Sequence, residues 1–353
     1  MTSPQHRTTT SQSTIAHDSN RSRRRRGTVV TLATGRTAAI AFALLILGAL
    51  AIALSPIFVR LSEIGPTTTA VWRVAIAVPA LMMWMAAENG GMRHSKSAKP
   101  AVPRGLRDYA LLALAGFLFA GDLAFWHWSI NFTSVANATL LANLAPVIVT
   151  GVSYLLFGER VTRLFLIGMV LSLAGAALLM SDSLTVSPET LFGDFLGVIT
   201  AMFYGGYIIA IGRLRARFST ATIMAWSALA TTAFLIPAGL LSGESFLPAT
   251  MTGWAILVAL ALISHAGGQG LITYALAHLP AAFSSVSLLV QPVAAAGLAW
   301  LVLGEAIGSI QAMGAGVVLA GIVMARFGTP RRPGTDPVTA AEEPESQKID
   351  HDR

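Results

Sequence analysis

The chain has 353 residues, of which 54% are hydrophobic and only 12% are charged, and its mean hydropathy is +0.66. This composition excludes a water-soluble protein of the same length and indicates an integral membrane protein. The formal net charge of +7 would suit a nucleic-acid-binding protein, but most basic residues lie in one tail and in the loops between apolar segments. There they orient a membrane protein, so we expect no nucleic-acid partner.

The residue types on which many metal, redox and nucleotide sites depend are missing or scattered. The chain has no cysteine, which excludes disulfides, thiolate catalysis and Cys-ligated zinc. Its seven histidines do not cluster like metal ligands, and it contains no His-Glu-x-x-His, Gly-x-Ser-x-Gly or Walker motif. We therefore expect no cofactor, no metal and no catalytic residues.

The two ends of the chain differ from its apolar body. Residues 1–35 are rich in Ser, Thr and Arg and contain the run Arg23 to Arg26. They form either a nucleic-acid-binding arm or a disordered basic cytoplasmic tail before the first helix, and we favour the tail. The first apolar segment lacks a small-x-small cleavage site, so we expect it to remain as an anchor. Residues 329–353, rich in Pro and Glu, predict a second disordered cytoplasmic tail.

Ten apolar segments follow one another between these tails. A helix needs about 20 apolar residues to cross roughly 30 Å of hydrocarbon. Segments of about this length lie, in chain order, at residues 37–59, 67–87, 109–130, 134–157, 164–181, 193–212, 220–241, 253–277, 281–303 and 309–326. The sequence thus predicts an all-α integral membrane protein with ten transmembrane helices.

Residues 111–176 recur, without a gap, at a constant offset of 146 positions. The matched pairs include Pro146 with Pro292, Gly158 with Gly304, Glu159 with Glu305, Gly168 with Gly314, and Gly175 with Gly321. Identity is only roughly a quarter of the positions, but it concentrates in Gly, Pro and Glu, whose backbone and charge requirements make chance matches rare. We infer a duplication of five helices, with repeats at residues 37–181 and 193–326.

Because each repeat has an odd number of helices, the second must enter the membrane from the face opposite to the first, and the two halves are inverted. If the N-terminus is cytoplasmic, Arg60 is the only basic residue between the tails that lies at an outer edge of the membrane. The outer loops hold the acidic residues Asp182, Glu189 and Glu244 instead, as the preference of basic residues for the cytoplasmic side predicts. The inner positions then hold Arg93, Lys96, Lys99, Arg104, Arg107, Arg160, Arg163, Arg213, Arg215, Arg217, Arg326, Arg331 and Arg332. We expect cytoplasmic N- and C-termini and a multi-pass protein of the plasma (inner) membrane.

The two Gly-Glu corners test this orientation, since they should lie on opposite faces. Arg160 and Arg163 follow the first corner, whereas residues 306–309 after the second corner carry no charge. The positive charges are therefore present only in the copy that we place inside. A bundle of unrelated helices gives no reason for this difference.

These features together resemble the EamA branch of the drug/metabolite transporter superfamily: ten spans in two inverted halves, a proline in the fourth helix of each half, and a Gly-Glu corner before a Gly-rich fifth helix. Arg73 resembles an arginine that is common in the second helix of that family. The resemblance covers about residues 37–326. It implies a substrate site near the membrane midplane between helices 1 to 4 and 6 to 9, with helices 5 and 10 as scaffold. It also implies a small-metabolite substrate and often export.

Asp122 lies inside the third segment, roughly 12 Å from its outer end, and Arg73 lies at a similar depth in the second. A charge at the membrane centre costs on the order of 2.5 to 3.5 kcal/mol, so Asp122 should face the bundle interior and have a partner or a proton. It is a structural ion-pair partner of Arg73, a proton-coupling carboxylate or a contact for a zwitterionic substrate. Gly268 and Ser227 replace these charges in the second half, which concentrates functional polarity in the first.

Further polar and aromatic residues lie in the same segments. Trp126 shares a helix face with Asp122 and is either an interfacial anchor or part of the cavity. His127 is expected to be interfacial or hydrogen-bonded, with a proton relay as the alternative, and the same choice applies to His265 and Gln269.

Asn143 and Pro146, and their near counterparts Gln291 and Pro292, predict a polar amide beside a helix break in each half. Inverted-repeat transporters build substrate sites from such breaks, and the alternative is a simple packing kink.

Small residues and the corner glutamates are expected to be structural. Small residues at four-residue spacing predict close helix packing or a homodimer, and the two sets are Gly168, Ser172 and Ala176, and Ala312, Gly316 and Ala320. Gly267, Gly268 and Gly270 predict a thin helix surface where either a neighbouring helix or the substrate approaches. Gly158, Glu159, Gly304 and Glu305 form the structural motif, in which each glutamate would interact with the N-terminal dipole of the next helix.

The sequence favours a secondary transporter that moves a small organic solute, a metabolite or a drug, by alternating access, with proton coupling through Asp122 as an added option. The candidate substrate-binding or coupling residues are Asp122, Arg73, Trp126, His127, Asn143, Pro146, Gln269, Gln291 and Pro292. The alternatives are an intramembrane enzyme and a non-transporting membrane scaffold or receptor. The expected partners are a small-molecule solute and the lipid bilayer.

Overall fold

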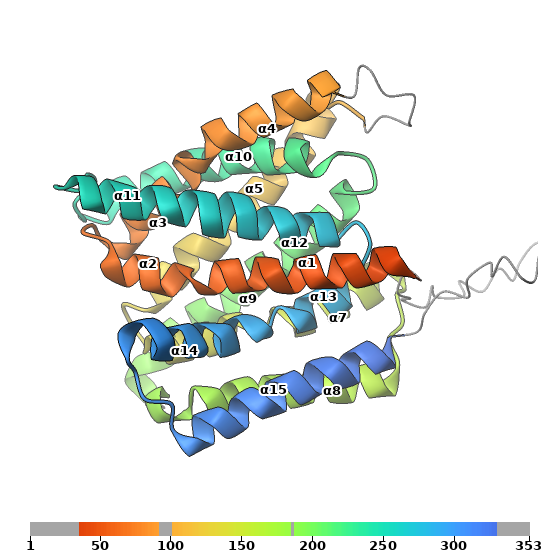
Figure 1. Cartoon of the computed structure of the whole chain (residues 1–353), viewed down its shortest axis with the longest axis vertical. Helices are drawn as coiled ribbons and strands as arrows, with labels where there is room; N and C mark the ends of the chain where they lie inside the picture. Colours follow the sequence, from red (N-terminus) through yellow and green to blue (C-terminus); the bar gives the residue numbers. More distant parts are fainter. Residues whose placement is uncertain (1–34, 92–100, 185–186, 330–353) are drawn as a thin grey trace, which may run out of the picture.

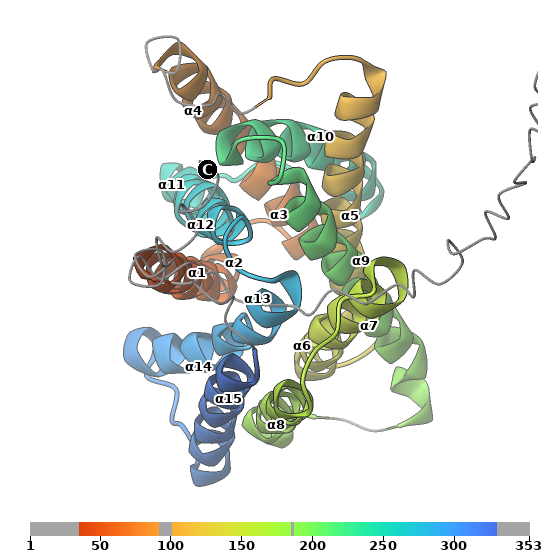
Figure 2. The same ribbon diagram turned by 90° about the vertical axis from the view of Figure 1, so that its right-hand side faces the viewer.

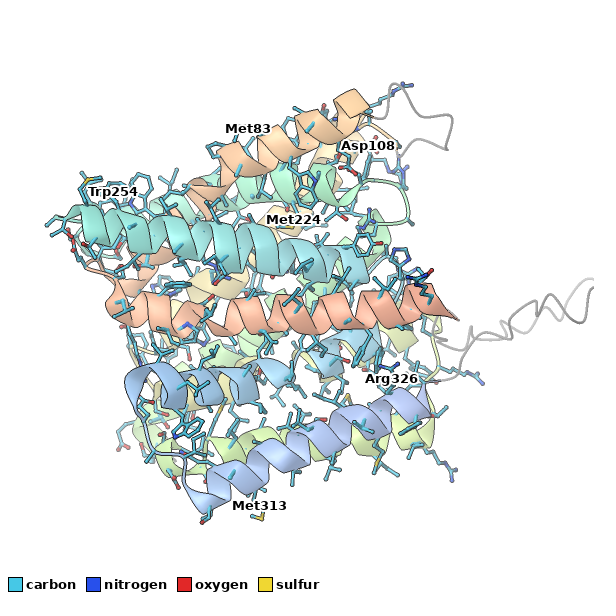
Figure 3. All side chains as sticks on the ribbon, viewed as in Figure 1. Met83, Asp108, Met224, Trp254, Met313 and Arg326 are labelled. Atoms are coloured by element: carbon cyan, nitrogen blue, oxygen red, sulfur yellow. The ribbon has the colours of Figure 1, made fainter. Side chains whose placement is uncertain are left out.

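The computed structural model describes residues 35–91, 101–184 and 187–329, and the regular elements within these ranges are helices. Most of the helices run along one common direction, so the molecule has two ends at which the chain turns (Figure 1). Trp254 and Met313 lie near one end, and Asp108 and Arg326 lie near the other (Figure 3). We call these the Trp254 end and the Arg326 end.

The helices in chain order are α1 (Arg36–Ala53), α2 (Ser55–Leu61), α3 (Pro66–Ala75), α4 (Ala77–Gly91), α5 (Leu106–Ser129), α6 (Val135–Ala142), α7 (Ala145–Phe157), α8 (Arg163–Leu179), α9 (Leu191–Leu214), α10 (Thr220–Leu241), α11 (Met251–Ala259), the π-helix η4 (Leu260–Gln269), α12 (Gly270–Ala275), α13 (Ala281–Ser287), α14 (Val290–Leu303) and α15 (Ser309–Gly328). Short 3₁₀ turns at Ser181–Ser183 and Pro188–Thr190 precede α9.

Within the described ranges, nine helical stretches are long and apolar enough to cross a membrane. They lie at Arg36–Leu61, Pro66–Gly90, Leu106–Ser129, Val135–Phe157, Pro188–Leu214, Thr220–Leu241, Met251–Ala275, Ala281–Val302 and Ser309–Gly328. The predicted segment 164–181 corresponds to α8, which is apolar but shorter, with 17 residues. The protein is therefore an all-helical, multi-pass membrane protein. The predicted tails and Arg93, Lys96, Lys99, Arg331 and Arg332 lie outside the described residues, apart from the tail-edge residues 35 and 329.

Several of the long stretches are interrupted. The helix breaks predicted beside Pro146 and Pro292 are present, because α6 ends at Ala142 before α7 begins, and α13 ends at Ser287 before α14 begins. Two further breaks, at Leu54 between α1 and α2 and at Ile76 between α3 and α4, were not predicted. Pro56 and Pro79 lie in the first turns after these breaks, so the proline signal used for the other two would have found them.

The helices α8 and α15 lie side by side along one edge of the molecule (Figures 1 and 2). A Cβ atom added at Gly168 would lie 2.4 Å from the Ala325 nitrogen, and one added at Gly314 would lie 2.4 Å from the Leu179 nitrogen. The two helix backbones are therefore in contact, and α8 and α15 run antiparallel. The 146-residue offset exchanges the two contacts, since it takes residue 168 to 314 and residue 179 to 325. We call this contact the seam.

The structure corrects one prediction about helix packing. On α15 the seam uses Gly314, Gly321 and Gly328, whereas Ala312, Gly316 and Ala320 are exposed on another face of the helix. Spacing by four residues identified the wrong face, because both faces of this helix contain small residues.

Gly268 of the glycine run contacts a neighbouring helix, which was one of the two predicted alternatives. A Cβ atom added at Gly268 would lie 3.0 Å from the carbonyl oxygen of Gly48 in α1 and 2.9 Å from Ile52. The position equivalent to Asp122 in the second half is thus filled by a helix contact, which leaves no room for a carboxylate.

Both Gly-Glu corners have the same backbone form. Gly158 ends α7 with φ of 66° and Gly304 ends α14 with φ of 70°, a left-handed conformation that favours glycine. Contrary to the prediction, the glutamates do not start the next helix. Thr162 accepts a hydrogen bond at the start of α8, and Gly308 is the cap of α15. The two glutamate carboxylates instead form ion pairs with arginines: Glu159 with Arg213, and Glu305 with Arg60.

At the Trp254 end, a glutamate in each of two loops accepts hydrogen bonds from the start of a helix that is far away in the sequence. The Glu244 carboxylate accepts hydrogen bonds from the backbone and hydroxyl of Thr68, 2.8 and 3.1 Å away, at the start of α3. The Glu63 carboxylate accepts bonds from the hydroxyl of Thr250 and from the backbone nitrogens of Thr250 and Ala249, just before α11. These bonds lower the pKa of Glu63, with the Thr250 hydroxyl as the largest cause.

Candidate functional site

Asp122 and Arg73 lie at the same depth in the bundle. Asp122 lies seven residues before the end of α5 at Ser129, and Arg73 lies seven residues after the start of α3 at Pro66. At 1.5 Å per residue, both are about 10 Å from the Trp254 end of their helices. The two half-buried side chains interact electrostatically.

The ion pair between these two groups, one of the alternatives that the sequence left open, is not formed as a direct contact in the described residues. Only three ion pairs within 4.0 Å occur in the described residues, and they join Arg60 with Glu305, Arg213 with Glu159, and Arg217 with Asp108. The described residues also provide no hydrogen-bond partner for the Arg73 Nε atom. Both charges are therefore available to a third group.

Two tyrosines of α9 complete this part of the site. Tyr204 and Tyr207 lie within electrostatic range of both Arg73 and Asp122. The two phenol rings stack with centroids 6.4 Å apart, and Phe119 of α5 packs 4.8 Å from Tyr207. Sequence analysis missed both tyrosines. The chain has only five tyrosines, so two of them in the middle of one apolar segment could have served as a signal.

The π-helix η4 brings polar groups of the second half to the same place. Gln269 donates a hydrogen bond from Nε2 to the Tyr207 hydroxyl, 3.2 Å away. The buried His265 ring lies 5.5 Å from Phe119, and neither of its nitrogens has a hydrogen-bond partner in the described residues. Helical segments with π geometry are frequent at functional sites.

Both helix breaks contribute an amide. Asn143 lies within the break between α6 and α7, and Gln291 lies in the first turn of α14, whose third residue is Pro292. Their Nδ2 and Nε2 atoms are buried without a partner in the described chain. Gln291 interacts through its side chain with Tyr204. The break at Asn143 lies beside α9, the helix that carries Tyr204. The carbonyl oxygen of Ala145, just after this break, would be 3.4 Å from a Cβ atom added at Gly205 of α9.

The remaining predicted residues lie closer to the Trp254 end of α5. His127 is buried, and its Nδ1 lies 2.6 Å from the Leu123 carbonyl oxygen, which supports the hydrogen-bonded interpretation. Trp126 is half-buried with its ring 5.0 Å from the His127 ring, and Trp128 is 59% exposed, as expected for a lipid-facing anchor.

The arrangement suits a small ligand with more than one kind of polar group. Arg73, Asn143 and Gln291 present donors from three different helical spans, and Asp122 presents an acceptor. A buried polar group without a partner costs about 1–3 kcal/mol, so a binding partner for these groups is favourable. In the described ranges no group of three or more His, Cys, Asp or Glu side chains could hold a metal ion.

Comparison with known proteins identifies the family. The sequence profile of the EamA-like transporter family matches this chain twice, at residues 39–181 and 191–327. An uncharacterised transporter of Archaeoglobus fulgidus is 29% identical over 276 residues, which cover 76% of this chain and 91% of that protein. The pseudopaline exporter CntI of Pseudomonas aeruginosa is 27% identical over 251 residues, or 71% of this chain and 83% of CntI.

Two more distant similarities agree. A probable terminal-alkyne amino-acid exporter of Streptantibioticus cattleyicolor is 26% identical over 219 residues, which cover 62% of this chain and 73% of that protein. One crystal structure superposes with a TM-score of 0.69 at 20% identity, covering 84% of this chain and 98% of the other, and shows the shared fold. Because the family profile covers most of the chain in two successive matches, this protein belongs to the EamA-like transporter family.

Proposed function

We propose that this transporter moves a small organic solute across the plasma membrane by alternating access. Its two inverted five-helix halves, residues 37–181 and 193–326, would expose a shared polar site first to one face and then to the other. Both termini would lie in the cytoplasm, as the distribution of basic residues favours.

The inverted arrangement is supported by the seam. Its contacts at Gly168 and Gly314 are exchanged by the same offset that relates the two sequence halves, and the two helices run in opposite directions. The helix α8 has 17 residues and would be about 26 Å long, which is at the lower limit for crossing the bilayer. We therefore count α8 as the tenth transmembrane helix.

One observation carries the proposal: polar groups without partners meet in the middle of the bundle and come from both halves. Arg73 and Asn143 belong to the first half, and His265 and Gln291 belong to the second; each has a buried nitrogen with no hydrogen-bond partner in the described residues. The acceptor Asp122, which interacts electrostatically with Arg73, also belongs to the first half. A purely structural bundle would satisfy these groups internally, since each orphaned donor is unfavourable in an apolar interior.

The charges favour a solute that has both a carboxylate and an ammonium group. Arg73 and the amides of Asn143 and Gln291 are donors for a carboxylate, while Asp122 is the acceptor for an ammonium group. The relative named as an amino-acid exporter is consistent with such a solute. We propose export, and we propose that Asp122 exchanges a proton for the solute's ammonium group, which would couple transport to a pH gradient.

The test is flux of amino acids and related zwitterions in proteoliposomes, with and without an imposed pH gradient, after a thermal-shift screen has found a stabilising solute. Asp122→Asn should abolish the dependence on the pH gradient. The matched control is Asp182→Asn, which changes an exposed carboxylate outside the polar site. An Asp122→Asn protein whose flux keeps its full pH dependence would exclude the proton role.

A further inference from the structure

Each Gly-Glu corner holds one ion pair to the other half of the chain. At the Trp254 end Glu305, after α14, pairs with Arg60, the penultimate residue of α2. At the Arg326 end Glu159, after α7, pairs with Arg213, the penultimate residue of α9, with Nη2 and Oε1 2.8 Å apart. We call these the outer and inner corner pairs. The outer pair also explains why Arg60 departs from the predicted distribution of basic residues.

The two pairs lie at opposite ends of the bundle. The start of α8 meets the end of α15, because the Thr162 hydroxyl bonds to the Gly328 carbonyl. The start of α15 meets the end of α8, where Gly314 contacts Leu179. The corners that precede α8 and α15 are therefore on opposite faces.

The outer corner pair is a weaker contact than the other polar contacts described at the two ends of the bundle. At the Trp254 end, Glu63 and Glu244 each accept several hydrogen bonds, including backbone ones. At the Arg326 end, Asp108 accepts a backbone bond and pairs with Arg217. The outer pair, by contrast, is one contact between side chains that are 60% and 51% exposed. Exposed ion pairs of this kind break and re-form easily.

Each corner is joined to the polar site by one unbroken helix. Gln291 lies in the first turn of α14, which runs from the break at residues 288–289 to the outer corner. Asn143 lies in the break from which α7 runs to the inner corner. A swing of either helix about its break would separate the corner pair and move the neighbouring amide, as a hinge at the end of a helix permits.

We propose that Arg60, Glu305, Arg213 and Glu159 are positioning residues for alternating access. The outer pair separates when the site opens at the Trp254 end, and the inner pair separates when it opens at the Arg326 end. One pair stays joined while the other is apart. This inference rests on the proposed transport function and assigns to these four residues the control of which face is open.

The two pairs differ in strength, which gives the cycle a preferred state. Glu159 is 23% exposed, less than half as much as Glu305, and Arg213 also lies 3.5 Å above the Phe157 ring. Partial shielding and a cation–π contact both strengthen the inner pair. The inner pair therefore stays joined for longer, and when the transporter opens, it opens more often at the Trp254 end than at the Arg326 end.

The chain has no cysteine, so paired cysteines report on these contacts without background. We would build Arg60→Cys with Glu305→Cys and, separately, Arg213→Cys with Glu159→Cys, and bridge each pair with a short, reducible bis-methanethiosulfonate. Either bridge should reduce solute flux at least about tenfold, and reduction should restore it. Methyl methanethiosulfonate, which modifies the same thiols without bridging them, is the matched control. Complete bridging of both pairs with flux unchanged would overturn the proposal.

The second measurement is labelling of an Asn143→Cys reporter by a membrane-impermeant maleimide applied from the Trp254 side. Arg60→Gln should raise the labelling rate and Arg213→Gln should lower it, each about two- to fivefold, the effect of one exposed ion pair. Exchanging the charges with Arg60→Glu and Glu305→Arg should restore the original rate. Equal labelling in all variants would contradict the inference.

These outcomes are separate from failure of the proposed function. If the unmodified protein moves none of the screened solutes, the transport proposal fails first. If it moves a solute and the bridges and reporter show no effect, transport stands and the role of the corner pairs is wrong.

Discussion

The seam and the central polar site use buried residues in opposite ways. At the seam, Gly168 and Gly314 bring two helix backbones into contact, so that a single added Cβ atom would meet a backbone nitrogen at 2.4 Å. At the polar site, the half-buried side chains of Arg73, Asn143 and Gln291 have buried donor nitrogens that the described residues leave unpaired. Close backbone packing stabilises the seam, whereas several nitrogen atoms of the polar site have no hydrogen-bond partner within the described protein.

The difference shows how one apolar bundle can combine rigidity with binding. In a membrane, helices associate through close packing of small residues, and the seam has this character. Polar groups that lack a partner in the protein gain most from a ligand, because the ligand satisfies them. Substitutions at the seam should therefore affect stability, and substitutions at the site should affect solute recognition.

The largest expected effect is at the seam. Gly168→Leu should cost at least about 3 kcal/mol, because overpacking against backbone atoms has no flexible neighbour to relieve it. The yield of folded protein in detergent and its thermal unfolding temperature measure this loss. Gly316→Leu is the matched control on α15, since Gly316 is exposed and no atom lies within 4 Å of a Cβ added there. A large loss for Gly316→Leu would instead indicate a contact with a second copy.

Charge removal at the site should change affinity with little change in stability. We expect Arg73→Gln to weaken binding of a carboxylate-bearing solute about tenfold to a hundredfold, the effect of a lost charge-assisted hydrogen bond of about 1.5–3 kcal/mol. The solute-induced thermal shift gives the affinity, and a solute with an amide in place of the carboxylate should be much less affected. Arg107→Gln, an exposed change of the same type, is the control. Equal losses for both solutes would contradict carboxylate recognition.

Loss of an internal hydrogen bond at the edge of the site should have a moderate effect. Tyr207→Phe removes the acceptor for Gln269 and should lower stability by about 1 kcal/mol. Unfolding of the protein without solute measures this change. Tyr204→Phe changes a half-buried neighbour on the same helix and serves for comparison. A more stable Tyr207→Phe protein would mean that the bond contributes nothing.

The smallest expected effect is at His265. Because neither ring nitrogen has a partner in the described residues, His265→Leu should leave stability unchanged or raise it by up to about 1 kcal/mol. Thermal unfolding without solute would record this, and solute binding should weaken at the same time. A clear fall in unfolding temperature would show that the ring is needed for packing against Phe119.

Short-range features were predictable because they depend on neighbouring residues. Stretches of apolar residues predicted the helical spans, and Pro146 and Pro292 predicted two helix breaks. The Gly-Glu corners were recognised as a repeated motif, and the family was identified from them and from the duplication. The assignment of Asp122, Arg73, Asn143 and Gln291 to a transport site stays a prediction.

Contacts between distant residues were not predictable. Nothing in the sequence joins Arg60 to Glu305, which are 245 positions apart, and the two tyrosines of α9 could not be placed beside Asp122. The sequence left open whether Asp122 pairs with Arg73, and the described residues show an electrostatic interaction between them but no contact within 4.0 Å. Distances between side chains on different helices depend on how the helices are rotated and tilted.

The sequence by itself therefore determined the membrane class, the positions of most helical spans, the breaks beside Pro146 and Pro292, and the two Gly-Glu corners. The tertiary structure decided which face of each helix packs, as the choice of Gly314 over Gly316 in the seam illustrates. The physical reason lies in the solvent. Lipid and protein interior are both apolar, so a membrane helix does not mark its buried face by hydrophobic periodicity as a helix in water does.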